Sequence, residues 1–466
     1  MMGEGTVLEK ESRAVAGQVG TADPANRSAQ LIARIESIPF SRWHIKPRVI
    51  MGSATFFDGY DALTLAYVLP VLNGMWKLSV AQTGLIIASG YLGQAIGAVI
   101  FGILAEKFGR LFSAKCAIFL MSVMGLGCMF AGSYNTLFVL RFIQGIGVGG
   151  EVPTAAAYIN ELSRAKGRGK FFMVYELIFP ISLMVTAQLG AVIVPSLGWK
   201  WMFLIGSAGG FVIVALLFRL RESPRWLISK GRFNEAEKVI EEMEASTAER
   251  LPVTLSATNA VKKPSAKELF SPVYCKRTLI VWGLWFSAYF VSNGLNNWLP
   301  SLYKTVYKLS LSDSLHAASL TNVVQVILVV ACAVLIDKVG RRRWVVAAFP
   351  VAAILLVALW AIGGKSPVNV MALGSSAYGA VGTITVLLYL YTPEIYPTRM
   401  RALGTSFATA WLRLASAIGP TILAFVLGAR GITTVFLMFA IVCAAGAVLG
   451  SQMIETREKI LEDIAP

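Results

Sequence analysis

Charged residues are scarce in this chain: they make up 15% of its 466 residues, whereas a soluble protein carries about a quarter. Histidine is nearly absent, and the two copies, His44 and His316, lie near the ends of apolar runs, which excludes a relay of buried histidines. The five cysteines show no CxxC spacing, and the sequence holds no metal-ligand cluster, nucleophile triad or phosphate-binding loop. We therefore expect no cofactor, no metal ion and no enzyme activity.

Apolar sequence is abundant instead. Hydrophobic residues make up 56% of the chain and form runs of about 17–25 residues, the length of a helix that spans a bilayer. No long stretch alternates apolar and polar residues, which favours helices over a β-barrel. The sequence thus predicts an all-α polytopic membrane protein embedded in the lipid bilayer. The twelve expected spans are 49–73, 82–105, 112–131, 135–161, 170–195, 200–219, 276–302, 314–336, 343–363, 368–392, 402–428 and 432–454.

The net charge of +16 is distributed unevenly over the loops. Basic residues gather in every second loop, for example at Lys107 and Arg110 and at Arg341 to Arg343, while the loops between them are almost bare. This positive-inside pattern predicts a multi-pass protein of the cell (inner) membrane with both termini in the cytoplasm. The positive net charge therefore reflects the orientation of the protein in the membrane, and nucleic acid is not expected as a partner.

One loop pattern occurs twice, half a chain apart: Gly102–Arg110 resembles Ala333–Arg342. Two further pairs of acidic residues keep nearly the same spacing: Glu161 with Glu394, and Glu222 with Glu455. Three repeated patterns at nearly the same spacing indicate two copies of one helical bundle. An internal duplication in so apolar a chain is typical of a secondary transporter, with its binding site where the halves meet.

These observations divide the chain into five parts. The polar N-terminal tail has no apolar core, so it is not a cleavable signal peptide and is expected to be mobile. The central hydrophilic loop is expected to have a mechanical role, with a short amphipathic helix over Phe233–Glu244 and a linker over Pro252–Pro272. The expected boundaries are 1–46 for the tail, 47–219 for a first six-helix bundle, 220–275 for the loop, 276–456 for a second six-helix bundle and 457–466 for a cytoplasmic C-terminal tail.

Several charged residues lie inside apolar spans, where a charge at mid-bilayer costs about 2.5–3.5 kcal/mol and marks a functional candidate. They are Asp58, Asp61, Arg141, Glu151, Glu176 and Arg413. Asp58 and Asp61 are three residues apart and share a helix face. Because two neighbouring carboxylates resist ionising together, one of them can bind and release a proton near neutral pH. The alternative is a structural role in a helix bend or an interhelical hydrogen bond.

The remaining intramembrane charges have different expected partners. Glu151 follows the glycine-rich run 145–150, whose small residues let a neighbouring helix approach, and it is either a second proton site or a gate residue. Glu176 is expected to form a structural pair nearer the cytoplasmic surface. Arg413 has no obvious acidic partner in the second half, so we expect a substrate anion there, with a backbone carbonyl or a water-filled cavity as the alternative.

Polar and aromatic side chains in the second half are expected to line a site for a small polar molecule. They are Asn293, Asn296, Asn297, Trp298, Gln325 and Tyr389. The asparagines follow helical spacing, and the aromatic residues would form walls for a ring. For each aromatic residue, simple packing or a place at the membrane interface is the alternative.

Residues 47–456 resemble the major facilitator superfamily. The doubled loop motif, the stretch Arg141–Gly145 and the half-end motifs Glu222–Leu227 and Pro393–Thr398 carry the resemblance, the last two being similar to those of sugar porters. Within the superfamily, Asp58–Asp61 looks like the first-helix signature of the aromatic acid:proton symporters. The second half resembles the niacin-transporter and synaptic-vesicle-glycoprotein branch. The resemblance implies twelve transmembrane helices in two pseudo-symmetric six-helix bundles.

The resemblance also implies roles for individual residues. Asp61 and Arg141 match a proton-coupling pair on adjacent first and fourth helices, and Asp58 matches a further essential aspartate. The alternative for Arg141 is a static ion pair that only holds the two helices together. In the loop motifs, Glu106 or Asp337 would bond helix ends across the cytoplasmic face and favour the outward-open state. The expected gating set is completed by Arg110, Arg341, Glu161 and Glu394.

We therefore expect a proton-coupled symporter that takes up a small organic anion, an aromatic or other monocarboxylate, by alternating access as a monomer. The symported proton would offset the charge of the entering anion. The seventh helix lacks the sugar-porter signature, which disfavours a hexose. The alternatives are a sugar, polyol or phosphate proton symporter, an exporter of aromatic compounds, and a membrane sensor that binds its ligand without moving it.

Overall fold

The computed structural model describes residues 24–162, 177–249, 266–364, 366–397 and 400–457, and every regular element in these ranges is a helix. Helices long and apolar enough to cross a bilayer occur in both halves of the chain. Each of the twelve expected spans overlaps a helix in the described ranges, and several span ends run one to three residues past the helix. Residues 170–176 of the fifth span lie outside the described ranges. The prediction of an all-α polytopic fold is confirmed.

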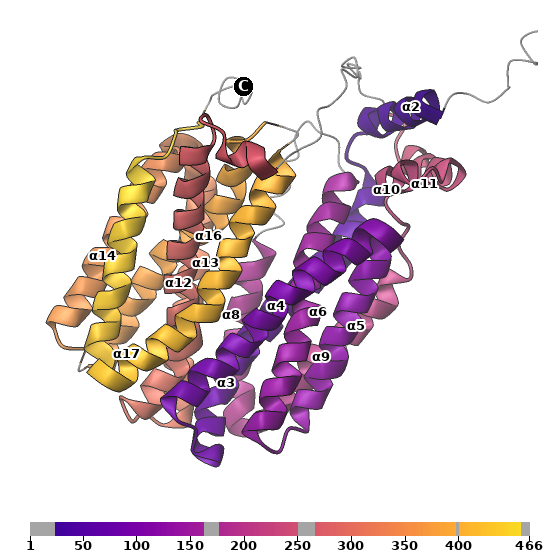
Figure 1. Ribbon diagram of the computed structural model, residues 1–466. Helices are drawn as coiled ribbons and strands as arrows, with labels where there is room; N and C mark the ends of the chain where they lie inside the picture. Colours follow the sequence, from indigo (N-terminus) through magenta and orange to yellow (C-terminus); the bar gives the residue numbers. More distant parts are fainter. Residues whose placement is uncertain (1–23, 163–176, 250–265, 365, 398–399, 458–466) are drawn as a thin grey trace, which may run out of the picture.

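The long helices form two bundles, one from each half of the chain (Figure 1). The first contains α3 (Arg42–Trp76), α4 (Val80–Phe108), α5 (Arg110–Met129), α6 (Tyr134–Glu161), α8 (Ile178–Ser196) and α9 (Lys200–Leu217). The second contains α12 (Cys275–Thr305), α13 (Leu311–Val339), α14 (Arg341–Ala361), α15 (Pro367–Asn369) continued by the π-helical turn Val370–Gly374 into α16 (Ser375–Glu394), and α17 (Arg401–Ser451). Gly431, at φ +78°, interrupts α17 and divides it into the last two spans.

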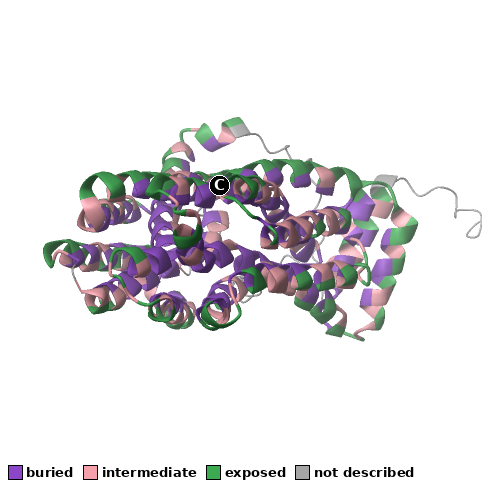
Figure 2. Cartoon of the chain, turned by 90° about the horizontal axis from the view of Figure 1, so that it is seen from below, coloured by how far each residue is buried: buried purple, intermediate pink, exposed green. Residues whose placement is uncertain are grey.

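Large apolar side chains cover the outside of both bundles. Val99, Val334 and Phe425 are 63%, 68% and 76% exposed, whereas buried residues gather inside the bundles (Figure 2). A surface of this kind in water would be an aggregation hazard. In a bilayer the same side chains face hydrocarbon, while each helix satisfies its own backbone hydrogen bonds.

The two bundles pack against each other near one end of the molecule. We call the end that carries the two loop motifs the motif end, and the opposite end the far end. Across the interface, α4 lies along α17, α8 along α13 and α12 along α3. Asn297 donates to the hydroxyl of Tyr91 (3.2 Å), and Gln188 donates to the carbonyl of Ser319 (3.5 Å). These residues lie in the far halves or middles of their helices, so the bundles meet on that side.

Gly84 shows how closely the bundles approach at the far end. It lies in the second turn of α4, and a Cβ at this position would stand 2.9 Å from the Cβ of Ala424 on α17. The polar contact nearest the motif end joins Arg413 to the carbonyl of Gly149 (3.3 Å), about 18 Å along α17 at 1.5 Å per residue. Beyond that depth, no hydrogen bond or ion pair joins the halves among the described residues.

Both loop motifs fold alike at the motif end. In the first, the Glu222 carboxylate accepts a hydrogen bond from the backbone N–H of Arg110 (3.1 Å) at the start of α5. In the second, Glu455 accepts from the N–H groups of Arg341 (2.9 Å) and Arg342 (3.1 Å) at the start of α14. Burial raises the pKa of Glu222. Each carboxylate satisfies free donors and complements the dipole at a helix N-terminus.

The ion pairs of the two motifs are also alike, and each stays within its own half. The pairs are Arg110–Glu106 (2.9 Å), Arg110–Glu161 (2.9 Å), Arg341–Asp337 (2.9 Å) and Arg341–Glu394 (3.3 Å). The bonds expected across the cytoplasmic face are therefore not formed among the described residues. The reason is the packing of the halves at the far end, which leaves the two motifs unconnected in this conformation.

Three short helices form a lobe at the motif end: α2 (Pro24–Ser37), α10 (Pro224–Ser229) and α11 (Phe233–Ala245) (Figure 1). The amphipathic helix expected over Phe233–Glu244 is confirmed as α11. The expectation of a mobile N-terminal tail is wrong for α2, since Leu31 and Ile35 are buried in one apolar cluster with Trp226 and Ile240. The few apolar residues of α2 become a recognisable face only once α10 and α11 cover them.

We predict that Arg34→Ala loosens α2 from the lobe. The Arg34 guanidinium lies 2.8 Å from Glu244 and 3.2 Å from Glu237, and its hydrogen bond to Glu244 raises the pKa of Arg34. Each partly exposed pair contributes about 0.2–1 kcal/mol, so docking should weaken by about 1 kcal/mol. Limited proteolysis should then cleave the N-terminal segment faster than in Lys238→Ala, which removes an exposed charge from α11. Equal cleavage would show that the apolar cluster alone holds α2.

A second prediction concerns the glycine of the second loop motif. Gly340 has φ +96°, and a Cβ there would stand 2.6 Å from a carboxylate oxygen of Glu455. Gly340→Ala should lower the thermal stability of the purified protein by about 1–3 kcal/mol, the range for one strained backbone position. Gly102→Ala is the control, because nothing lies within 4 Å of a Cβ at Gly102 and the residue is helical. Equal melting temperatures for the two variants would contradict the prediction.

Candidate functional site

A buried ion pair joins two helices of the first bundle. Arg141 on α6 donates from Nη1 to both carboxylate oxygens of Asp61 on α3, at 3.0 Å each. The side chains are 7% and 11% exposed. The pair expected between the first and fourth spans is thus formed, because α3 packs against α6. Removing either partner would leave an uncompensated buried charge, which is strongly destabilising.

Gln144 completes the hydrogen-bond network of this pair. Its Nε2 donates to Asp61 (2.6 Å), and its Oε1 accepts from Arg141 (2.8 Å). Sequence reasoning missed Gln144 as a functional residue, although its spacing of three residues from Arg141 places both on one helix face. Every hydrogen-bond partner of Asp61 among the described residues is a donor, so the network suits the ionised carboxylate.

Glycines bring α4 and α6 together around the pair. A Cβ at Gly90 would stand 3.5 Å from Nη2 of Arg141, and a Cβ at Gly145 would stand 2.2 Å from the carbonyl oxygen of Gly90. The close approach expected of the glycine-rich run 145–150 is therefore present. The contact leaves no room for lipid beside the guanidinium.

Asp58 on α3 and Arg413 on α17 bring two further charges to the interface between the halves. Asp58 is 4% exposed, and its Oδ1 has no hydrogen-bond partner among the described residues. Arg413 donates to the Gly149 carbonyl (3.3 Å) and lies within electrostatic range of Asp58 and Tyr389. The described part of the chain offers Arg413 no ion pair. Its other N–H donors remain available to an anion.

Glu151 lies closer to the motif end of α6 and is completely buried. It accepts a hydrogen bond from the hydroxyl of Thr55 on α3 (3.2 Å). The bond links the same two helices as the Asp61–Arg141 pair. Both expectations for Glu151, a gate residue and a second proton site, are compatible with this position. Glu176 lies outside the described residues.

The polar residues expected on the seventh span divide between two surroundings. Asn293 on α12 donates to Ser416 on α17, and Asn297 donates to Tyr91 on α4 of the other half. These two asparagines, four residues apart, therefore lie at contacts with neighbouring helices. Asn297 connects the second half directly to the region of the ion pair.

Three other candidates lie inside the second bundle. Asn296 accepts from Asn322 on α13 (3.1 Å), and Gln325 accepts from Tyr378 on α16 (2.8 Å). Trp298 is 3% exposed and belongs to the apolar core. The hydrogen bonds of Asn296 and Gln325 join helices of the second half.

Tyr389 belongs to an aromatic group on α12 and α16. Its ring packs edge-on against Trp285, with centroids 4.6 Å apart, and Trp285 stacks on Tyr289 at 5.5 Å. The Trp285 indole donates to Thr392 (2.9 Å), which holds the ring in place. Sequence reasoning missed Trp285 and Tyr289, because an aromatic residue in a membrane helix usually only packs.

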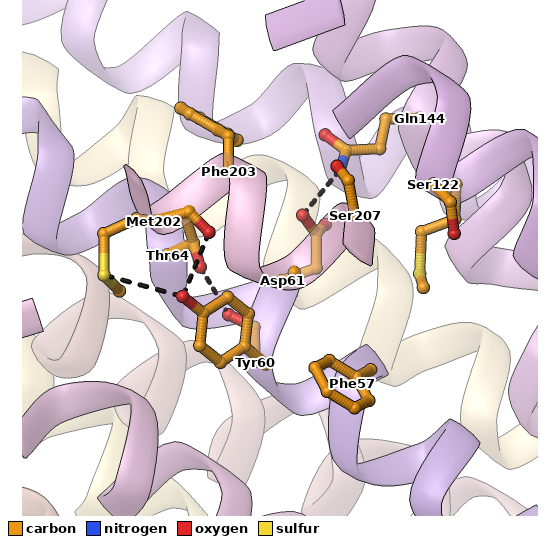
Figure 3. Close-up of a pocket in the computed structure, with 11 residues that line it drawn as sticks. Phe57, Tyr60, Asp61, Thr64, Ser122, Gln144, Met202, Phe203 and Ser207 are labelled. Atoms are coloured by element: carbon orange, nitrogen blue, oxygen red, sulfur yellow. Dashed lines mark hydrogen bonds between the residues drawn. The ribbon is translucent and has the colours of Figure 1, made fainter. Parts of the chain in front are cut away.

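Two small cavities flank the Asp61–Arg141 pair. The first lies inside the first bundle on the Asp61 side (Figure 3). Its polar lining consists of Tyr60, Asp61, Thr64, Ser122, Gln144 and Ser207. The second lies on the Arg141 side, and its lining includes Gly90, Tyr91, Gln94 and Asn297. Since Asn297 comes from α12, the second cavity is shared by both halves.

Comparisons with known proteins agree with this architecture. The family model described as sugar (and other) transporter matches residues 48–466. The niacin transporter NiaP of Acinetobacter baylyi is 30% identical over 93% of this chain and 99% of that protein. The synaptic vesicle 2-related protein of Rattus norvegicus is 25% identical over 95% of this chain and 84% of that protein. The xylose transporter XylE from E. coli, solved in a partially occluded inward-open conformation, has a TM-score of 0.73 at 22% identity, covering 90% of this chain and 100% of that one.

The fold, the buried charges and these relatives define a membrane transporter and not an enzyme. The chain belongs to the sugar (and other) transporter family of the major facilitator superfamily. At 22% identity, the likeness to the xylose transporter shows the fold alone. The substrate must therefore be argued from the side chains of the site.

Proposed function

We propose that the protein is a proton-coupled symporter that takes up a small organic anion, an aromatic or other monocarboxylate. The observation that carries the proposal is the buried Asp61–Arg141 pair on α3 and α6, beside the interface of the two halves. When Asp61 binds a proton it loses its charge, and its attraction to Arg141 falls. Protonation and helix movement are thereby linked. A relative with 30% identity is a niacin transporter, and niacin is a small aromatic monocarboxylate.

Arg413 supports an anionic substrate. One of its donors is held by the Gly149 carbonyl, and the planar fork of the guanidinium fits a carboxylate with two hydrogen bonds. Tyr389 is partly exposed and lies within electrostatic range of Arg413. An aromatic acid bound to Arg413 could place its ring against this tyrosine.

Asp58 helps to balance the negative charge of the bound anion against the positive charge of the proton. It shares its buried surroundings with Asp61 and Arg413. An anion at Arg413 adds negative charge beside these aspartates, so its binding favours proton uptake by one of them. The proton then offsets the charge of the anion while both cross the membrane.

The arrangement of the bundles supports alternating access. If the basic motif end faces the cytoplasm, the contacts at the far end close the outer side, and the described state faces inward. In the outward-facing state we expect the motif ends to approach each other. The charged groups that would then form the cytoplasmic lock are Glu106, Arg110, Glu161, Asp337, Arg341 and Glu394.

We further propose a protein of the cell inner membrane with both termini in the cytoplasm. The boundaries expected from the sequence, at 47–219 and 276–456, serve as the limits of the two moving bodies. Both halves of the site belong to one chain, so a monomer suffices for transport.

A sugar or polyol is the second candidate substrate. The amides of Asn293, Asn297 and Gln325 are suitable hydrogen-bond partners for hydroxyl groups, and the family includes sugar transporters. Uptake of labelled nicotinate into whole cells, challenged with benzoate or with neutral sugars, separates the two candidates. Competition by carboxylates supports the anion, and competition by sugars alone supports the second candidate.

We predict that Asp61→Asn abolishes accumulation driven by a pH gradient in proteoliposomes, with a loss of about tenfold or more. Asparagine cannot bind a proton, so substrate exchange at equal pH on both sides should persist while uphill transport stops. Asp313→Asn is the control, because Asp313 is exposed at the far end of α13 and should leave accumulation unchanged. Full accumulation by Asp61→Asn would remove Asp61 from the coupling role.

Arg413→Ala should weaken carboxylate binding by about 10- to 100-fold, as expected for loss of hydrogen bonds to a charged group. Arg413→Lys should give an intermediate value, since lysine keeps the charge but loses the planar fork. Titration of the purified protein with nicotinate measures the affinity, and Arg430→Ala at the exposed far end of the same segment is the control. An unchanged affinity in Arg413→Ala would assign the anion to another group.

A further inference from the structure

The hydrogen bonds of the ion-pair network leave a protonated Asp61 without an acceptor. Arg141 carries donors only. Gln144 donates to Asp61 through Nε2, while its Oε1 already accepts from Arg141 and from the thiol of Cys128 (3.6 Å). A protonated carboxyl has an O–H group, and a buried O–H without an acceptor is costly. If Asp61 carries a proton, its O–H group needs a hydrogen-bond acceptor other than Arg141 or Gln144.

The cavity inside the first bundle lies on the Asp61 side of the ion pair, where such an acceptor can be placed. It is enclosed by α3, α5, α6 and α9. Ser207 on α9 is 3% exposed, and its Oγ has no hydrogen-bond partner among the described residues. In Figure 3 the Ser207 hydroxyl lies beside the Gln144 amide, which is hydrogen-bonded to Asp61. Ser122 on α5 donates to the carbonyl of Ile118 (2.7 Å), which leaves its oxygen able to accept.

Small residues keep this space open. A Cβ at Gly125 would stand 2.7 Å from Oγ of Ser207, and a Cβ at Gly210 would stand 2.0 Å from Oγ of Ser122. The remaining space is enough for about one water molecule, and polar partners line it. The apolar lining residues are Phe57, Met121, Met202, Phe203 and Gly206. A polar cavity of this size suits a bound water better than any larger ligand.

We propose that this cavity binds one water molecule that bridges Asp61 to Ser207 and Ser122 and stabilises the proton-loaded form of Asp61. The inference rests on the proposed function, because it concerns the transported proton. The water accepts from the O–H of protonated Asp61 and donates to a serine oxygen. When Asp61 is ionised, its oxygens already accept hydrogen bonds from Arg141 and Gln144, so the water contributes mainly to the protonated form. Ser207 and Ser122 are positioning residues that act through the water, and no covalent bond changes.

Titratable groups surround Asp61 on four helices. They are Asp58 and Tyr60 on α3, Tyr91 on α4, Cys128 on α5 and Arg141 on α6. The cavity residues of α9 include no titratable side chain. A substitution at Ser207 therefore changes the hydrogen bonding of Asp61 without changing a charge, which makes it a clean probe of the water.

The test measures the pH at which uptake by the full-length protein in proteoliposomes is half-maximal. Ser207→Ala removes a partner of the water, so the protonated form is destabilised and more acid is needed to load Asp61. The midpoint should shift to lower pH by about half to one unit, the size of one net hydrogen bond. Ser207→Thr retains the hydroxyl and should restore the wild-type midpoint.

Ser182→Ala is the matched control. Ser182 on α8 is also buried against α3, beside Gly59, but its hydroxyl donates to the carbonyl of Phe179 on its own helix (2.7 Å). It does not line the cavity. Its loss should leave the midpoint unchanged, and an equal shift in Ser182→Ala and Ser207→Ala would overturn the proposal.

Infrared difference spectra between acid and neutral pH give a readout independent of transport. The carbonyl band of protonated Asp61, identified by its loss in Asp61→Asn, should move to higher wavenumber in Ser207→Ala because its O–H loses an acceptor. An unmoved band overturns the proposal, as does stabilisation of the wild-type protein by Na⁺ that Ser207→Ala abolishes, which would make the cavity a cation site. Wild-type uptake that does not depend on pH would refute the proposed proton coupling. The carbonyl band of Asp61 would still show whether the water is bound beside it.

Discussion

A charge inside a membrane helix must find its partner within the protein, and in this chain that requirement shapes the first bundle. The Asp61–Arg141 pair holds α3 against α6, and glycines on α4 and α6 narrow the space around it. Gln144 then satisfies both charged groups at once. Packing and electrostatics therefore depend on one another here, because the pair is tolerated only where the helices exclude lipid and supply hydrogen bonds.

The two halves share one architecture but differ in chemistry. Both loop motifs use a carboxylate to cap the following helix and an arginine with two acidic partners. The paired aspartates, however, lie only in the first half, and Arg413 with its aromatic neighbours lies in the second. Under the proposed function, the proton binds to the first bundle and the anion binds to the second. Relative movement of the halves then changes the electrostatic contact between Asp58 and Arg413, which offers a physical link between the two.

Sequence reasoning succeeded where a single strong constraint acts. The spans were predictable because a bilayer demands about twenty apolar residues per helix. The Asp61–Arg141 pair was predictable because an intramembrane charge needs a counter-charge and because the family resemblance implies that the first and fourth spans are neighbours. Ser207 and Gln144 were missed because an uncharged polar residue is common in membrane helices and carries no comparable penalty. The docking of α2 was missed since its apolar face is small and its partners, α10 and α11, lie about two hundred residues away.

The amino-acid sequence by itself determined the class of fold, the duplication and the identity of the buried charges, because hydropathy and motif spacing are local properties of the chain. Only the tertiary structure decided where the halves meet, that the motif ion pairs stay within each half, and which side of Asp61 opens on a polar cavity. These features arise from contacts between helices distant in sequence. Neither the composition nor the periodicity of one helix specifies which neighbour faces a given side chain.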